Sequence, residues 1–192
     1  MKDEMSSKED EIIQRIAGKV REEREKKHWS LSDLAERSGV SRAMIHKIER
    51  AESSPTATIL ARLSAAFDMS MSQLLAEADT RSGTLIKLAE QPTWTDPETG
   101  YLRRQVSSWQ LPVDIVSIEL PAQCSVTIPT VSYPARRQLI WVSEGELTFT
   151  EGERTTVLSV GDCLELGEPT ECTFHNATEI LCRYTVVVVK PA

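Results

Sequence analysis

Residues 42–47 of this chain of 192 amino acids carry side chains that proteins use to read DNA. Arg42, Ala43 and Lys47 are spaced to share one face of a short helix, with His46 at the edge of that face. Arginine can pair with both O6 and N7 of guanine, and alanine can contact the methyl group of thymine. The pattern therefore indicates base recognition in the major groove, although Lys47 fits a phosphate contact or plain solvation equally well.

Hydroxyl side chains stand on both sides of this helix. Ser41 precedes it, and Ser53, Ser54 and Thr56 occupy the loop that follows, where Pro55 bars a helix. These hydroxyls could donate to DNA phosphates or could act only as helix caps, and the sequence leaves both roles open.

Two short helices joined by a tight turn must position these residues. Leu34 lies on the apolar face of the first helix, and Ile45 and Ile48 share a face of the second. Ser30, with an acidic residue three positions later, is a capping-box-like start. Gly39 falls where a helix end needs a left-handed backbone. Residues 30–49 thus predict a helix-turn-helix, whose second helix enters the DNA major groove.

Charge is unevenly distributed along the chain. Residues 12–62 contain eleven basic and seven acidic side chains, a net charge of +4. Because the whole chain has a net charge of −7, the other residues together carry −11. A basic segment on an acidic chain suits a DNA-binding module joined to a domain that does not bind DNA. Random scatter of charge over a solvated surface is the alternative.

The periodicity divides the chain into two domains. We expect a disordered or frayed segment at 1–11, a five-helix domain at 12–77, a polar linker at 78–84 and a β domain at 85–192. Short runs rich in Val, Ile, Thr and Tyr, punctuated by Gly and Pro, are typical of an all-β barrel or jelly roll. The expected helices are 12–28, the pair within 30–49, one beginning after Thr56 or Thr58, and 71–76; the expected strands are 115–120, 124–128, 138–142, 146–150, 155–158, 172–174 and 180–189.

No long apolar run predicts a membrane span, and the polar N-terminus does not read as a signal peptide. The four cysteines have no CxxC spacing, which favours reduced thiols in the cytoplasm. Three of them, Cys163, Cys172 and Cys182, could form a redox sensor or could be small buried hydrophobes.

The helix pair and the loop after it resemble the lambda-repressor-like, or XRE-type, helix-turn-helix family over roughly residues 12–77. The resemblance is carried by Leu34-Ala35, Gly39-Val40, Ile45, Ile48-Glu49-Arg50 and Ser53-Ser54-Pro55. It implies a homodimer that binds double-stranded DNA at a palindrome-like operator, with the two recognition helices one DNA turn apart.

The β domain resembles the cupin family at Gln138 to Gly145, Glu146-Leu147, Gly161-Asp162 and Asn176. This resemblance implies a small jelly-roll β-barrel with an interior pocket. The two resemblances together imply a transcriptional regulator in which the cupin domain senses a small molecule.

The positions at which cupins hold metal are altered here. Val131 to Pro134 stand where two histidines are usual, Gln138 replaces the glutamate, and Cys172 replaces the second-block histidine, while His175 is out of register. One thiol with neutral neighbours is a poor ligand set. We therefore expect no metal, no other cofactor and no enzymatic activity. The alternative is a cupin enzyme, a metal-dependent oxygenase or isomerase, with an accessory DNA-binding domain.

Strand alternation places the candidate effector-binding residues toward the pocket or at its rim. An arginine there would favour a carboxylate-bearing ligand, such as an amino acid or small organic acid. The competing interpretation is a solvated arginine and a pocket filled by side chains. The candidate residues are Tyr133, Arg136, Gln138, Cys172, Phe174 and Tyr184.

Overall fold

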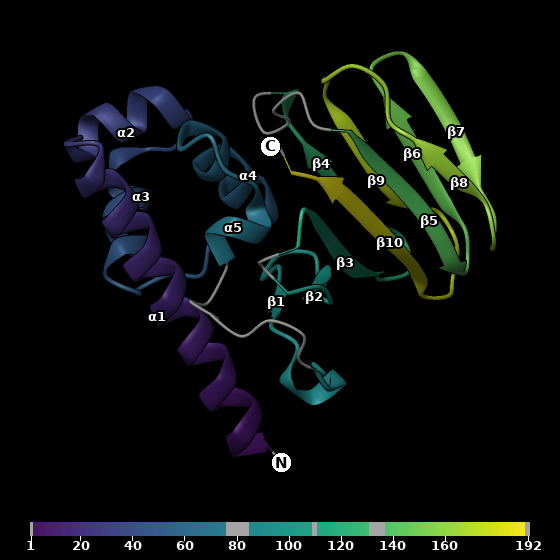
Figure 1. The fold of residues 1–192 in the computed structure, drawn as a ribbon, viewed down its shortest axis with the longest axis horizontal. Coiled ribbons are helices and arrows are strands. Elements are labelled where there is room, and N and C mark those ends of the chain that lie inside the picture. The colour runs from purple at the N-terminus through teal and green to yellow at the C-terminus, as the bar shows by residue number, and fades with distance from the viewer. Residues whose placement is uncertain (1, 76–84, 109–110, 131–136, 191–192) are drawn as a thin grey trace. The chain divides into compact units, whose positions relative to one another are not determined.

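The computed structural model describes residues 2–75, 85–108, 111–130 and 137–190, with side chains from Asp10 onward. The chain divides into two compact units, residues 1–77 and 78–192. Figure 1 colours the first unit purple to blue and the second teal to yellow. The predicted linker at 78–84 lies outside the described residues.

Five helices build the first unit, as the sequence predicts (Figure 1). The first helix begins at Lys2, ten residues before its predicted start, so the segment expected to be frayed is helical in this structure. This segment contains neither Gly nor Pro and includes several good helix formers. The helices are α1 (Lys2–Lys26), α2 (Leu31–Ser38), α3 (Arg42–Glu49), α4 (Ala57–Ala66) and α5 (Met71–Leu75).

All five helices contribute apolar side chains to one core. Each fully buried Leu or Ile stabilises the fold by about 1.5–3 kcal/mol relative to exposure, so this shared core holds the short helices together. The buried side chains include Ile16, Val20, Leu34, Ile45, Ile48, Leu60, Leu63 and Leu74.

The second unit consists, in its described part, of two antiparallel sheets preceded by a single 3-10 turn, η1 (Leu88–Glu90). The six-stranded sheet has the order β1-β2-β3-β10-β5-β8, and the four-stranded sheet the order β4-β9-β6-β7. The strands are β1 (Thr93–Thr95), β2 (Leu102–Gln105), β3 (Val113–Leu120), β4 (Cys124–Ile128), β5 (Gln138–Glu144), β6 (Leu147–Glu151), β7 (Arg154–Leu158), β8 (Cys163–Glu165), β9 (Cys172–Asn176) and β10 (Cys182–Val189).

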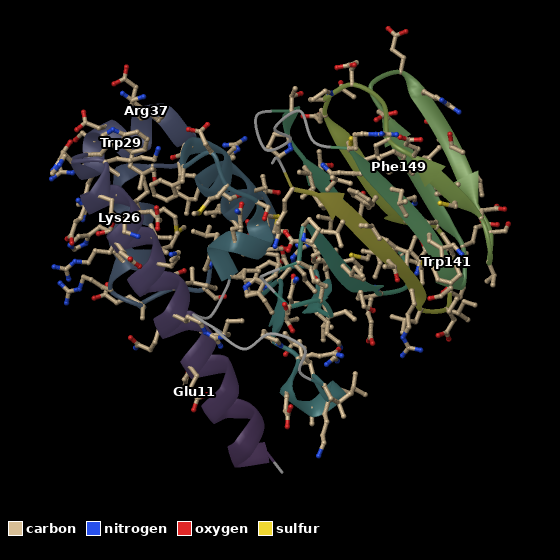
Figure 2. The ribbon with its side chains drawn as sticks, viewed as in Figure 1. Glu11, Lys26, Trp29, Arg37, Trp141 and Phe149 are labelled. Atoms are coloured by element: carbon tan, nitrogen blue, oxygen red, sulfur yellow. The ribbon has the colours of Figure 1, made fainter. Side chains whose placement is uncertain are left out.

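Aromatic side chains join the two sheets face to face. Phe174 on β9 stacks on Tyr184 of β10, with ring centroids 5.6 Å apart, and Phe149 on β6 lies 5.0 Å from Phe174. Phe149 is labelled on its strand in Figure 2. Buried residues on the inner faces alternate with half-buried ones on the outer faces, as in β9, where Cys172, Phe174 and Asn176 are buried. The predicted jelly-roll class is therefore confirmed.

Three strands, β1, β2 and β8, were not among those predicted from the sequence. Each has only three or four residues, and β2 reads Leu-Arg-Arg-Gln, without apolar alternation. Such strands exist because longer neighbours pair with them: β2 pairs with β3, and β8 pairs with β5.

Candidate DNA-binding helix and effector domain

The turn between α2 and α3 is fixed by local hydrogen bonds. Ser30 and Asp33 form a capping box: the Asp33 N–H donates to Ser30 Oγ at 3.2 Å, and the Ser30 N–H donates to Asp33 Oδ2 at 2.8 Å. The Ser30 hydroxyl also donates to Asp33 Oδ2 at 2.7 Å, and this bond, followed by the one from the Ser30 N–H, lowers the pKa of the Asp33 carboxyl group. Gly39 ends α2 with a φ of 66°, the left-handed conformation predicted for it. Buried Ser38 donates to Leu34 O at 2.6 Å and thereby secures the last turn of α2.

Helix α3 buries one face and exposes the other. Ser41 caps it by accepting from the Met44 N–H at 3.2 Å, so the capping role proposed for Ser41 is present. Ile45 and Ile48 are buried against the core. The exposed residues of the helix and its N-cap are Ser41, Arg42, Ala43, His46 and Lys47, which are five of the eight residues predicted to contact DNA.

The loop after α3 carries the other three residues predicted to contact DNA phosphates. Ser53, Ser54 and Thr56 are half-buried, and Pro55 is buried. Thr56 caps α4 by accepting from the Ile59 N–H at 3.4 Å. The loop hydroxyls therefore lie close to the protein surface, and Thr56 has a structural function whether or not it touches DNA.

A bidentate ion pair ties α1 to α3. Arg24 Nε donates to Glu49 Oε1 at 2.7 Å, and Nη2 donates to Oε2 at 2.8 Å. A third bond runs from Arg24 Nη1 to Trp29 O at 2.8 Å. A run of charged residues such as the second half of α1 normally faces water. The Arg24 side chain is nevertheless only 14% exposed, because α1 packs against α3.

Trp29 is a second anchor next to the helix pair (Figure 2). Its ring stacks on that of Phe67, with the ring centroids 5.9 Å apart. The guanidinium carbon of Arg37 lies 4.5 Å from the Trp29 ring centroid, and Lys27 Nζ lies 5.2 Å from it. Contacts of this cation–π kind contribute about 0.5–1 kcal/mol each at exposed sites. The basic residues at this end of the domain are thus partly structural.

The candidate effector residues are divided between the two sheets. Tyr133 and Arg136 lie outside the described residues. Gln138 is half-buried on the inner face of β5, in the row that contains Val188 of β10. Cys172 is buried, and its thiol donates to Thr170 O at 3.4 Å. Their roles in ligand binding stay predictions.

The stacked rings of Phe174 and Tyr184 pack the core between the two sheets. The neighbouring Arg137 is exposed and pairs with Glu165 at 2.8 Å. Phe174 and Tyr184 thus pack the core, and Arg137 forms a surface ion pair. These contacts fit the competing interpretation, in which side chains fill the space between the sheets.

A polar group on the inner face of the six-stranded sheet was missed from the sequence. Trp94 of β1 lies opposite Arg103 of β2, which lies opposite buried Ile118 of β3, so all three share the inner face. Gln105 is two residues further along β2 on that face, next to fully buried Asp114. The only signal in the sequence was an unusual density of polar residues in a short strand.

Within the described ranges, no group of three or more His, Cys, Asp or Glu side chains is placed to hold a metal ion. Among the same residues, none of the helices is both long and apolar enough to cross a membrane.

The architecture is that of a helix-turn-helix domain followed by a jelly-roll β domain. The helix-turn-helix family model (HTH_3) matches residues 20–74. These residues thus match a helix-turn-helix domain, in agreement with the resemblance found over residues 12–77 of the sequence.

Relatives and a solved structure extend this finding. The chain is 43% identical over 53 residues to the HTH-type transcriptional regulator SutR of Escherichia coli K12, and 37% identical over 65 residues to SinR of Bacillus licheniformis. These matches cover 28% and 33% of this chain but only 30% and 59% of those proteins. The crystal structure of an HTH_3 family transcriptional regulator from Vibrio cholerae aligns over 96% of this chain and 99% of that one, with a TM-score of 0.79 and 21% identity, which shows a shared fold.

Proposed function

We propose that this protein is a sequence-specific, DNA-binding transcriptional regulator located in the cytoplasm. The observation that carries the proposal is the recognition helix, whose apolar face is locked into the core while Arg42, Ala43, His46 and Lys47 face solvent together. The helix-turn-helix relatives, which are named as transcriptional regulators, support it.

The test compares base-reading and phosphate-contacting residues. Selection of bound sequences from a random DNA pool with purified protein gives the operator. Arg42→Ala is expected to relax the preference at one base pair, at a cost of about 1–3 kcal/mol. Lys47→Ala is expected to weaken binding to all sequences. It should also reduce the slope of the logarithm of the binding constant against the logarithm of the salt concentration by about one.

Arg154→Ala, an exposed substitution on β7, is the matched control and should leave operator affinity unchanged. If Arg42→Ala gives the same base preferences as the wild type, Arg42 does not read bases. If the wild type selects no sequence, the proposal fails.

A homodimer joined through the β domain is part of the proposal. Exposed apolar side chains on the outer face of the six-stranded sheet support it, notably Trp141, which is 51% exposed (Figure 2), and Val189. A dimer would present two recognition helices to half-sites about 34 Å apart. Light scattering should give twice the 21.5 kDa mass of one chain, and a monomer at operator-binding concentrations would contradict this.

The β domain is proposed to bind a small effector that alters operator affinity, with a coupling of about 1–3 kcal/mol. The resemblance to cupin sensors and the separate core of this unit support this role. The second candidate, a cupin enzyme, requires a metal or catalytic groups. Metal analysis of purified protein separates the two, because a stoichiometric bound metal would favour the enzyme.

A further inference from the structure

Two buried polar atoms of the β domain, Trp94 Nε1 and Gln105 Oε1, have no hydrogen-bond partner within the described part of the chain. Trp94 is 2% exposed and Gln105 is 6% exposed. Leaving a buried donor or acceptor unpaired costs about 1–3 kcal/mol, and few such groups persist in native proteins. A bound molecule that pairs with both atoms would recover this free energy.

The strand register brings both residues next to Arg103. Trp94 lies directly opposite Arg103 in the β1–β2 pair, and Gln105 is two residues along β2 on the same face. Diagonal neighbours of this kind are about 7–8 Å apart, a span that a small organic molecule can bridge. Burial raises the pKa of the buried Tyr101 hydroxyl, and the positive charge of Arg103 together with a hydrogen bond from its side chain opposes that rise, so one part of the guanidinium already contacts this hydroxyl.

Hydrogen bonds orient the Gln105 amide. Its Nε2 donates to Ser107 Oγ at 3.0 Å and to Asp114 Oδ1 at 3.5 Å, which leaves Oε1 as the acceptor without a partner. The Asp114 carboxylate also pairs with Lys190 Nζ at 3.0 Å. The sheet face thus presents a cation at Arg103, a donor at Trp94 and an oriented acceptor at Gln105.

We infer that Trp94, Arg103 and Gln105 form a binding site for a small carboxylate that also carries an amino or hydroxyl group. The carboxylate pairs with the guanidinium and the indole N–H, and the amino or hydroxyl group donates to Gln105 Oε1. The inference rests on the proposed effector-binding function and assigns it to residues other than the six predicted from the sequence. Both α-amino acids and 2-hydroxy acids carry this chemistry.

The experiment is calorimetry and thermal unfolding of the full chain with two sets of probes. One arm uses the standard L-amino acids, and the other uses glycolate, L-lactate and L-malate. Trp94→Phe removes the indole N–H and keeps an aromatic ring, and Arg103→Gln removes the charge. Arg104→Gln is the matched control, because Arg104 lies on the opposite face of β2.

We expect at least one probe to bind the wild type and the Arg104→Gln variant equally, and to bind the other two variants at least about tenfold more weakly. Whichever arm contains that probe identifies the second group of the ligand. The inference is overturned if no probe in either arm binds the wild type. It is also overturned if the Trp94→Phe variant binds the probe as tightly as the wild type does. If Arg103→Gln does not fold, the Trp94→Phe comparison alone decides.

Operator binding without any probe is measured on the same preparations. It tests the proposed regulator separately, because the inferred site lies in the β domain and the DNA-reading residues lie on α3. Normal operator binding with no probe bound refutes the site alone. Loss of specific DNA binding by the wild type refutes the regulator.

Discussion

Replacing Arg24 with Met should destabilise the helical unit severely. The substitution removes two hydrogen bonds to Glu49 and one to Trp29 O, all between 2.7 and 2.8 Å. It also strands the Glu49 carboxylate, whose side chain is 9% exposed. Breaking a buried ion pair on one side costs about 3–5 kcal/mol. Because water retains some access to both side chains, we expect about 2–3 kcal/mol here.

Urea and thermal unfolding followed by circular dichroism at 222 nm would measure this loss, since the α-helices of the described chain all belong to the first unit. For a unit of this size, a loss of 2–3 kcal/mol lowers the Tm by roughly 10–20 °C. The matched control is Arg21→Met, one turn earlier on α1, where the exposed side chain pairs with exposed Glu25. This control should show no resolved change.

A double-mutant cycle with Glu49→Gln isolates the pair itself. The two substitutions together should cost clearly less than their sum, because each alone leaves an unpaired group. The explanation is refuted if Arg24→Met unfolds at the same temperature as Arg21→Met, or if the two substitutions are additive.

Three further predictions concern the β domain. Gly145→Ala should cost about 2 kcal/mol or more in urea unfolding, because φ is +75° and the added Cβ would lie 2.7 Å from Leu181 O; a neutral result would contradict this. Asn176→Asp should cost about 3 kcal/mol or more by the same measurement, because the buried amide donates to three carbonyl oxygens that a carboxylate would repel, and wild-type stability would disprove this account. In native protein at pH 8, a thiol reagent should modify Cys163 alone, because it is the exposed cysteine while the other three are buried. Burial, and to a smaller extent two nearby glutamates, raises the pKa of Cys182 to about 11 and keeps that thiol protonated at pH 8. A second thiol that reacts as fast as Cys163 would argue against this prediction.

The helix-turn-helix could be predicted from the sequence because its determinants are local. The 3.6-residue period of Leu34, Ile45 and Ile48 and the left-handed position at Gly39 each depend on residues a few positions apart. The ion pair of Arg24 with Glu49 could not be predicted in this way. Its members are 25 residues apart, and Arg24 stands in a run of charges that normally faces water.

The β domain shows the same division. Alternation in β5 and β9 predicted which side chains face inward, and the burial of Ile140, Val142, Cys172 and Phe174 follows it. Arg103 was missed because a charged residue in a polar four-residue strand reads as exposed. Only pairing with β3, whose inner residues are buried, turns it inward.

The buried and exposed faces of α3 have separate functions, and this separation affects how the DNA sequence read by α3 can change in evolution under the proposed function. Within the described chain, α3 is held by its buried isoleucines, by the Ser41 cap and by the pairing of Glu49 with α1. None of these contacts uses the side chains of Arg42, Ala43, His46 or Lys47. Substitutions on such a face usually change stability by less than about 0.5 kcal/mol. Arg42, Ala43, His46 and Lys47 can therefore be exchanged at little cost to folding. Under the proposed function, selection could change the DNA sequence that α3 reads while the helices that hold it stay the same.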